Sequence, residues 1–261
     1  MTTKGETDMD FGLRERRVLV TGGSGTIGRA VSAAFGAEGA QVIVGYHSRP
    51  AEADEAVKTV EAAGGRAIPL KLDLSQPESL AVSVADIEAA AGPIDVLVNN
   101  AVAWPTGGTF GEQFEDVSID RVRRSVEANV VGAYALSQAV VASMRTRRWG
   151  RVVHISTGLV LDGFAGSGPY TTPKAALAGL TKTMSRELAG IGILTNLVMA
   201  GFVSHGDVPD AVLEQVTRAA ATRRTTEAWE VANVVVFLCS AANGNVTGET
   251  VRADGHFLTR D

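Results

Sequence analysis

The sequence predicts an α/β fold in a single domain, a doubly wound parallel sheet (Rossmann fold) with helices on both faces. Short runs rich in Val and Ile alternate with longer amphipathic stretches over most of the 261 residues. This alternation is typical of repeated strand–helix–strand units. Several of the short runs are apolar throughout, as expected for strands that are covered on both faces. No Pro/Gly-rich linker divides the chain, so we expect one domain over residues 17–261 after a frayed tail over residues 1–16.

Each predicted strand except the last is followed by a stretch with helical periodicity or by the flap described below. The strands are predicted at Val18–Val20, Gln41–Val44, Ala67–Leu72, Val96–Val98, Val152–Ile155, Leu194–Val198 and Glu249–Arg252. The helices are predicted at Ile27–Glu38, Ala51–Ala63, Pro77–Ala90, Ile119–Arg145, Ala175–Leu188 and Glu227–Ser240. Residues 201–226 have weaker periodicity, and we interpret them as a mobile substrate flap that carries a short helix.

The composition argues against several classes of protein. Lys and Arg total 24 and Asp and Glu total 29, which gives a net charge of −5 without any long basic tract. We therefore expect no binding to nucleic acid or to a membrane surface. No secretory signal or run of 18 apolar residues is found, and Cys239 is the only cysteine. These features favour a cytoplasmic protein in a reducing compartment.

A glycine-rich turn follows the first predicted strand and precedes the first predicted helix. It contains G-x-G-x-x-G at Gly23, Gly25 and Gly28. Without a Cβ atom the backbone can approach a pyrophosphate closely, and the N-terminus of the next helix supplies free N–H groups. A flexible turn without a ligand is the alternative. The residues expected to contact a dinucleotide here are Gly22, Gly23, Ser24, Gly25, Thr26, Ile27 and Gly28.

The end of the second strand indicates which dinucleotide is bound. A carboxylate at this point would bind the ribose 2′-hydroxyl of NAD, but no acid occurs before Glu52. Arg49 can pair with a 2′-phosphate, Ser48 can donate a hydrogen bond to it, and His47 can assist. We therefore expect NADP(H) to be preferred over NAD(H). The alternative is that Arg49 only caps a surface loop.

Three further motifs follow in order along the chain. Asn99–Ala101 ends the fourth strand, Ile155–Thr157 ends the fifth, and Tyr170–Lys174 opens a helix. Together with the glycine-rich turn, these motifs resemble the short-chain dehydrogenase/reductase family in its compact single-domain branch, from about Arg17 to Gly255. The chain is similar to ketoreductases of the 3-oxoacyl-carrier-protein reductase type. The resemblance implies an NADPH-dependent carbonyl reductase.

The expected catalytic residues are Tyr170, Lys174, Thr157 and Asn129. Tyr170 and Lys174 are four residues apart and so share one helix face. A nearby ammonium favours phenolate, so we expect Lys174 to lower the pKa of Tyr170, which gives its proton to the carbonyl oxygen during reduction. The resemblance implies that Lys174 also binds the nicotinamide ribose and that Thr157 holds the substrate oxygen. We expect Ser156 to face the other side of its strand.

The resemblance also implies a role for Asn129 and further contacts with the cofactor. Asn129 would hold a water in a proton relay from Lys174, although it could equally be a polar helix residue with local hydrogen bonds. Asp73 would contact the adenine or would only organise its own turn. Asn99 and Ala101 should approach the cofactor through their backbone. The remaining residues expected to bind the cofactor are Leu74, Asn100, Gly201 and Val203.

Some positions depart from the family pattern. Thr26 replaces a glycine of the turn, Val102 ends the motif that begins at Asn99, and Ala200 replaces a proline. The threonine expected soon after Gly201 is replaced by Ser204-His205. None of these changes removes a proton donor, but they leave open a protein that binds NADP(H) without catalysis.

Apolar residues dominate the segments that should surround the substrate, which favours a medium-sized apolar ketone, aromatic or aliphatic, with a free biosynthetic intermediate as one candidate. An NAD-dependent alcohol dehydrogenase and an imine reductase are the alternatives. No pair of histidines has metal-site spacing, so we expect no metal. By resemblance, two long helices should form a homodimer or homotetramer. The expected substrate-contacting residues are Trp104, Leu159, Phe164, Phe202 and His205.

Overall fold

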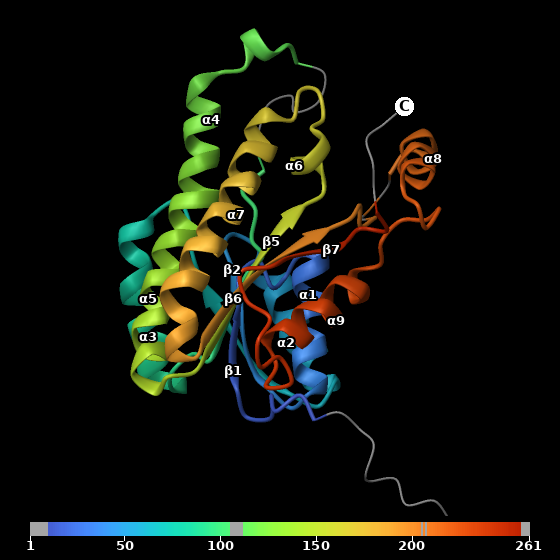
Figure 1. Cartoon of the computed structure of the whole chain (residues 1–261). Helices are drawn as coiled ribbons and strands as arrows, with labels where there is room; N and C mark the ends of the chain where they lie inside the picture. The colour runs from blue at the N-terminus through green and yellow to red at the C-terminus, as the bar shows by residue number, and fades with distance from the viewer. Residues whose placement is uncertain (1–9, 105–111, 205, 207, 257–261) are drawn as a thin grey trace, which may run out of the picture.

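The computed structural model describes residues 10–104, 112–204, 206 and 208–256 of the chain, and its centre is one all-parallel sheet. The seven strands lie in the order β3-β2-β1-β4-β5-β6-β7 (Figure 1). The chain therefore returns from β3 at one edge to place β4 beside β1, which creates a topological switch point between these two strands. The strands are β1 (Arg17–Val20), β2 (Gln41–Tyr46), β3 (Arg66–Lys71), β4 (Val96–Asn99), β5 (Gly150–Thr157), β6 (Ile193–Ala200) and β7 (Thr250–Ala253).

Helices cover both faces of this sheet. On one face Phe35, Val60 and Val235 belong to a core beneath α1, α2 and α9. On the other face Leu80 and Leu136 belong to a second core beneath α3, α5 and α7 (Figure 1). Strands β4, β5 and β6 are buried along their whole length, including polar residues such as His154 and Asn196. The predicted doubly wound fold is confirmed. The helices are α1 (Thr26–Ala37), α2 (Pro50–Ala62), α3 (Pro77–Ala91), α5 (Gly132–Arg147), α7 (Gly168–Leu188) and α9 (Ala228–Cys239).

The long helix predicted from Ile119 to Arg145 is interrupted. It consists of α4 (Ile119–Val126), a π-helical turn over Glu127–Val131 and then α5. The Asn129 amide donates from Nδ2 to the Ser125 carbonyl at 2.9 Å, so the side chain competes for the acceptor that a regular α-helix gives to the Asn129 N–H. Such a bulge in a helix often marks a functional site.

Residues 11–16, before the predicted boundary at residue 17, belong to the folded domain. Leu13 is 1% exposed in the core, and the Phe11 carbonyl accepts a hydrogen bond from Ala241 N at 2.8 Å. The expectation of a frayed tail through residue 16 is therefore wrong for residues 11–16, because these residues bury apolar surface and pair their backbone. Residues 1–9 lie outside the described residues.

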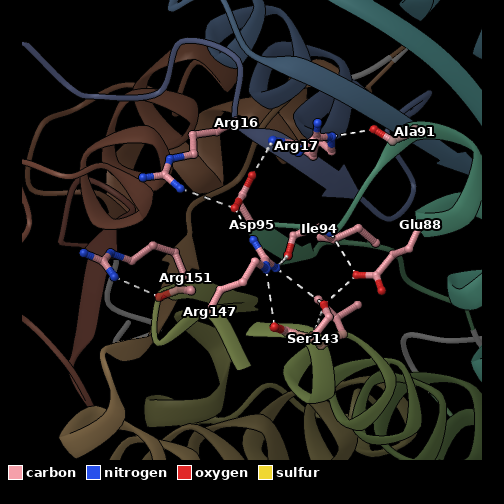
Figure 2. Close-up of polar contacts among 11 residues, drawn as sticks. Arg16, Arg17, Glu88, Ala91, Ile94, Asp95, Ser143, Arg147 and Arg151 are labelled. Carbon is pink, nitrogen blue, oxygen red and sulfur yellow. Dashed lines mark hydrogen bonds and ion pairs between the residues drawn. The ribbon is translucent and has the colours of Figure 1, made fainter. Parts of the chain in front are cut away.

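An ionic cluster around Asp95 joins three elements at the amino ends of the central strands. Asp95 is 4% exposed, and its carboxylate accepts from Arg17 N at 3.0 Å and from Arg16 Nη1 at 3.4 Å. The Arg147 guanidinium of α5 also donates to it (Figure 2). The cluster therefore fixes β1, the start of β4 and the end of α5 at the edge of the sheet where these strands begin.

The segment predicted as a substrate flap contains the expected short helix, α8 (Asp210–Ala219). The segment is closed at its base, where Thr226 N donates to Phe202 O at 3.0 Å and Val203 forms a β-bridge with Thr226. No described residue of α8 is buried, and Figure 1 shows the helix outside the two helical layers. Its mobility stays a prediction. Three shorter helices complete the fold, namely η1 (Phe114–Asp116), α6 (Leu159–Asp162) and η3 (Ala189–Ile191).

Candidate active site

A cavity of about 1700 Å³ lies at the carboxyl ends of the strands. Its walls come from segments that follow β1, β2, β3, β4, β5 and β6, together with Asp254 after β7. Doubly wound sheets bind ligands at this edge, beside the switch point between β1 and β4. The position and size of the cavity fit a dinucleotide with a second molecule next to it.

The glycine-rich turn forms one end of this cavity and fits a pyrophosphate. Gly22 has φ +61°, and a Cβ atom on Gly28 would lie only 2.1 Å from Gly22 O. Both positions therefore require glycine. Helix α1 begins after Gly25 without a side-chain hydrogen bond at its cap and without an acid in its first turn. Its N-terminal N–H groups are thus available to an anion.

One residue of the predicted turn has a different role. Gly23 does not line the cavity. It faces β1 and β2, where a Cβ atom would lie 3.0 Å from Val44 Cγ1 and 3.1 Å from Val20 O. The absence of a side chain at Gly23 lets the turn pack closely against β1 and β2. Ser24, Thr26 and Ile27 do line the cavity, together with Gly22, Gly25 and Gly28.

The segments after β2 and β3 combine cationic and anionic groups. His47, Ser48 and Arg49 line the cavity, as do Asp73 and Leu74. Arg49 Nη1 lies 3.8 Å from Glu52 Oε1, and His47 Nε2 lies 3.5 Å from Asp73 Oδ2. The hydrogen bond from the Ser75 hydroxyl, together with the Ser75 N–H and His47, lowers the pKa of Asp73. The site can therefore offer Arg49 and Ser48 to a phosphate and Asp73 to a hydrogen-bond donor.

Asn99, the last residue of β4, and Asn100, which follows it, have different surroundings. Asn100 lines the cavity, and its Nδ2 donates to Thr21 O at 2.9 Å, which ties this segment to the glycine-rich turn. Ala101 also lines the cavity, and its N–H donates to Thr21 Oγ1 at 3.0 Å. Asn99 is 4% exposed, and its Nδ2 donates to Ser137 Oγ at 3.0 Å on α5. The expectation that Asn99 lines the cofactor trough is therefore wrong.

Tyr170, Thr157 and Lys174 come together in the cavity wall where β5 ends and α7 begins. The Thr157 side chain hydrogen-bonds to Tyr170. Lys174 is buried, and its Nζ donates to Ile155 O at 2.9 Å. The Ser156 hydroxyl donates to Lys174 O at 3.0 Å. Thr157 is thus placed against the phenol, whereas Ser156 holds the backbone of α7 against β5.

Burial determines the proton affinities of this group. Burial raises the pKa of Tyr170, and the hydrogen bond from Thr157 opposes this only in part. Burial also lowers the pKa of Lys174 to about 8. The expectation that Lys174 lowers the pKa of Tyr170 is therefore wrong for the chain's own groups, because the phenol loses water on burial and only the Thr157 hydrogen bond opposes this.

Asn129 does not line the cavity, and its amide is occupied by the protein itself. Its Oδ1 accepts from Ala103 N at 2.9 Å, and its Nδ2 donates to Ala103 O at 3.0 Å. The same Nδ2 also donates to Ser125 O. These bonds fix the segment that follows β4. The resemblance implies a relay water at Asn129, and a water held by the side-chain amide would have to displace one of these bonds.

The expected substrate residues divide into three groups. Trp104, Leu159 and Phe202 line the cavity. Phe164 is 43% exposed and is not part of the wall, because the chain turns at Gly163, which has φ +75°. His205 lies outside the described residues. Gly201 and Val203, expected to contact the cofactor, do line the cavity.

Arg29 and Asp254 are among the residues of the cavity wall that sequence reasoning did not find. Arg29 follows Gly28 directly in α1, and Asp254 follows β7. Asp254 is 3% exposed, and its carboxylate accepts from Arg252 Nη2 at 2.7 Å and from His256 N at 2.9 Å. The rule that ligands lie at strand ends, applied to the last strand as well, would have identified Asp254. A basic residue in the first turn of the helix would have identified Arg29.

Within residues 10–104, 112–204, 206 and 208–256, no three His, Cys, Asp or Glu side chains are grouped so that they could hold a metal ion. In the same part of the chain, no helix combines the length and apolar character needed to span a bilayer.

The fold and the cavity define the protein as a Rossmann-type oxidoreductase that uses a dinucleotide. Comparison with known proteins specifies the family. A family model described as short chain dehydrogenase matches residues 16–215, and the chain belongs to this short-chain dehydrogenase/reductase family. It is an NAD(P)-dependent oxidoreductase that acts on carbonyl or hydroxyl groups.

The relatives span nearly the whole chain. The chain is 36% identical over 244 residues to the acetoacetyl-CoA reductase of Shinella zoogloeoides, covering 92% of this chain and 97% of that protein. It is 33% identical over 246 residues to the 3-oxoacyl-[acyl-carrier-protein] reductase of Pseudomonas aeruginosa, covering 93% and 97%. Among solved structures, LugOII is described as a promiscuous reductase that catalyses keto-reduction at C1 during lugdunomycin biosynthesis. LugOII superposes with a TM-score of 0.85 at 32% identity, covering 93% of this chain and 98% of LugOII.

Proposed function

We propose that this protein is an NADPH-dependent ketoreductase that acts on a medium-sized apolar ketone. The observation that carries the proposal is the contact of Tyr170 with Thr157, next to Lys174, in a cavity that also contains the glycine-rich turn. The relatives named above reduce carbonyl groups, which supports the same direction of reaction here.

The chemistry follows from the protonation states of the side chains. The glycine-rich turn and Lys174 would hold the dinucleotide, which, in its reduced form, would supply the hydride for the carbonyl carbon. Tyr170 donates the phenolic proton to the carbonyl oxygen, which completes the alcohol. Because burial raises the pKa of Tyr170, the phenol holds this proton at neutral pH. Thr157 hydrogen-bonds the same oxygen, and the Lys174 ammonium stabilises the phenolate that forms.

The preference for NADPH over NADH rests on the segment after β2. Arg49 and Ser48 can bind a 2′-phosphate, and Arg49 needs only to leave an exposed and weak pairing with Glu52 at 3.8 Å. His47 lies beside them and beside Asp73. The first carboxylate after β2 is that of Glu52, so a direct ligand for the 2′-hydroxyl of NADH is missing at the usual place.

The substrate class rests on Trp104, Leu159 and Phe202, which contribute apolar surface to a cavity wall that also contains Arg124 and Glu127. We propose a free ketone, such as a biosynthetic intermediate, and a cytoplasmic location. We also propose a homodimer or homotetramer formed through α4, α5 and α7. Val131, which ends the π-helical turn, and Tyr134, in the first turn of α5, support an interface here, since they are 38% and 47% exposed.

The test is NADPH consumption with a panel of ketones, compared with NADH and with imines. Replacement of Tyr170 by Phe should lower kcat/KM about 10²- to 10⁴-fold, because it removes the proton donor and keeps the ring. NADPH affinity, measured by fluorescence titration, should stay within about threefold. The control is Tyr134→Phe, at an exposed tyrosine of α5 outside the cavity wall; it keeps the ring at the proposed interface and should not change the rate.

Retained turnover in the Tyr170→Phe variant would overturn the mechanism. Tight NADPH binding without turnover of any carbonyl or imine would instead indicate a binding protein. A lower dissociation constant for NADH than for NADPH would contradict the cofactor preference alone.

A further inference from the structure

Trp104 covers one face of the proposed proton donor. The indole and phenol rings of Trp104 and Tyr170 are stacked, with centroids 4.7 Å apart and planes inclined by 13°. Aromatic pairs of this kind are attractive beyond the apolar area that they bury. The stacked face of Tyr170 is therefore closed to a substrate, and a carbonyl group must reach the phenolic oxygen at the edge of the ring.

The position of Trp104 is fixed by the protein rather than left to a free loop. Both polar backbone atoms of the preceding residue, Ala103, are hydrogen-bonded to the Asn129 amide at 2.9 and 3.0 Å. Asn129 is 5% exposed, and its Nδ2 is also bound to Ser125 O and Oγ. The π-helical turn that contains Asn129 therefore holds the backbone next to the indole.

Trp104 still has much of its surface available. It is 52% exposed and lines the cavity together with Leu159 and Phe202. An indole has two aromatic faces, and only one of them can contact Tyr170. The rest of the ring system offers a flat apolar surface within a cavity wall, next to the group that would protonate the substrate.

We propose that Trp104 is a specificity-determining residue that selects ketones carrying a planar aromatic or conjugated group. The planar group stacks on the indole while Trp104 keeps the phenol of Tyr170 in place. This inference rests on the proposed ketoreductase function and adds the substrate class. A saturated ring of the same size would fill the same space but would lose the stacking contact.

The experiment compares two β-keto esters that differ only in one ring, ethyl benzoylacetate and its cyclohexyl counterpart. The unchanged enzyme should have a KM about 3- to 10-fold lower for the aryl ketone, since stacking contributes about this factor. Trp104→Leu should bring the two KM values within about twofold, and Trp104→Phe should keep most of the preference. The matched control is Trp229→Leu, at an indole of α9 that is 59% exposed and outside the cavity wall.

Binding without turnover separates the inference from the proposed function. In the Tyr170→Phe background the ring for stacking remains, and calorimetry with NADPH present gives the affinity for both ketones. Equal affinities in this background, or an aryl preference that survives in Trp104→Leu, would overturn the role of Trp104 even if the enzyme reduces ketones. An aryl preference that depends on Trp104, in an enzyme that reduces neither ketone, would uphold the binding site and refute only the reaction.

Two conservative variants, Trp104→Phe and Trp104→His, keep the inference testable if Trp104→Leu does not fold correctly. If Trp104→Leu has an altered circular dichroism spectrum, the comparison is made with Trp104→Phe and Trp104→His, which keep smaller rings. The aryl preference should then decrease in the order Trp, Phe, His. The absence of any such order would refute stacking.

Discussion

Tyr170 and Lys174 are both withdrawn from water, and burial reverses the order in which they lose their protons. In water a phenol and an ammonium titrate close together, near pKa 10. Here the pKa of Tyr170 is raised, whereas that of Lys174 is lowered to about 8. The state present at neutral pH is therefore a neutral phenol beside a charged ammonium, which suits a proton donor with a stabilising cation.

This order predicts the pH dependence of keto reduction. Lys174 is charged below about pH 8 and neutral above it, so kcat/KM should be level near neutral pH and fall as pH rises through about 8. The fall occurs because the phenolate left by Tyr170 loses its stabilising charge. Initial rates from about pH 6 to about pH 10 measure the profile.

The control for this profile is Lys174→Arg. A guanidinium keeps its charge throughout the range, so the variant, although slower, should show no decline near pH 8. A wild-type profile that declines only near the usual pKa of a free phenol would contradict the assignment to Lys174. A decline near pH 8 in both proteins would assign it to another group.

The sequence supports prediction of the members of this group but not of their proton affinities. Tyr170 and Lys174 share a helix face by spacing alone, and Thr157 ends a predicted strand, so their meeting could be predicted. The direction of the Tyr170 shift could not, because it depends on how α7 packs against β5 and removes water. The stacking of Trp104 on Tyr170 could not be predicted from a local sequence pattern either, since it depends on the contact between Asn129 and Ala103.

At the scale of the elements, Gly28 and Gly25 of the glycine-rich turn lack a side chain for different reasons. A Cβ atom on Gly28 would collide with Gly22 O at 2.1 Å and with Asn100 Nδ2 at 2.8 Å, both within the protein. A Cβ atom on Gly25 would be 3.4 Å from Gly22 O, at the limit of an ordinary contact. Gly28 is therefore required by the fold itself, whereas the reason for Gly25 lies with the ligand.

Alanine substitutions should distinguish these two reasons. Gly28→Ala should lower Tm by about 5 °C without any ligand, since overpacking costs about 1–3 kcal/mol. Gly25→Ala should keep Tm within about 2 °C but raise the dissociation constant for NADPH at least about tenfold, because a methyl group blocks backbone approach. Thermal denaturation with and without NADPH measures both effects. A Gly28→Ala protein as stable as the wild type would show that the turn can relax, against this account.

The strands and helices themselves were largely predictable, and the exceptions have identifiable causes. Short runs rich in Val and Ile located all seven strands, including β3 and β7, which are partly exposed. The π-helical turn at Glu127–Val131 breaks a pattern that is periodic on both sides, so no local signal marks it. Leu13 lies in a polar segment that looks like a tail, and only its contact with the core reveals its role.

Across the whole molecule, the two ends of the strands have different functions. The ionic cluster of Asp95 lies where the central strands begin, and Tyr170, Thr157 and the glycine-rich turn lie where strands end. Between them lies a buried polar cluster, in which the His154 ring contacts Asn99 Nδ2 at 3.2 Å. His154 is fully buried. The charge of Lys174 in the active site acts on the proton affinity of His154, and through it on the stability of the fold.

Burial, with a smaller effect from the Lys174 charge, lowers the pKa of His154 to about 4. The unfolded chain takes up a proton at this histidine below about pH 6.5, whereas the folded chain does so only near pH 4. The free energy of unfolding should therefore fall as pH decreases through this window, by about 2 kcal/mol at about pH 5 from this residue. Urea denaturation at about pH 7 and about pH 5 measures the loss, and His154→Gln, which can keep a bond to Asn99, should remove this part of it. If His154→Gln loses as much free energy of unfolding as the wild type over the same pH interval, the loss of stability in acid comes from other groups. Protonation of His154 would then make no measurable contribution to it.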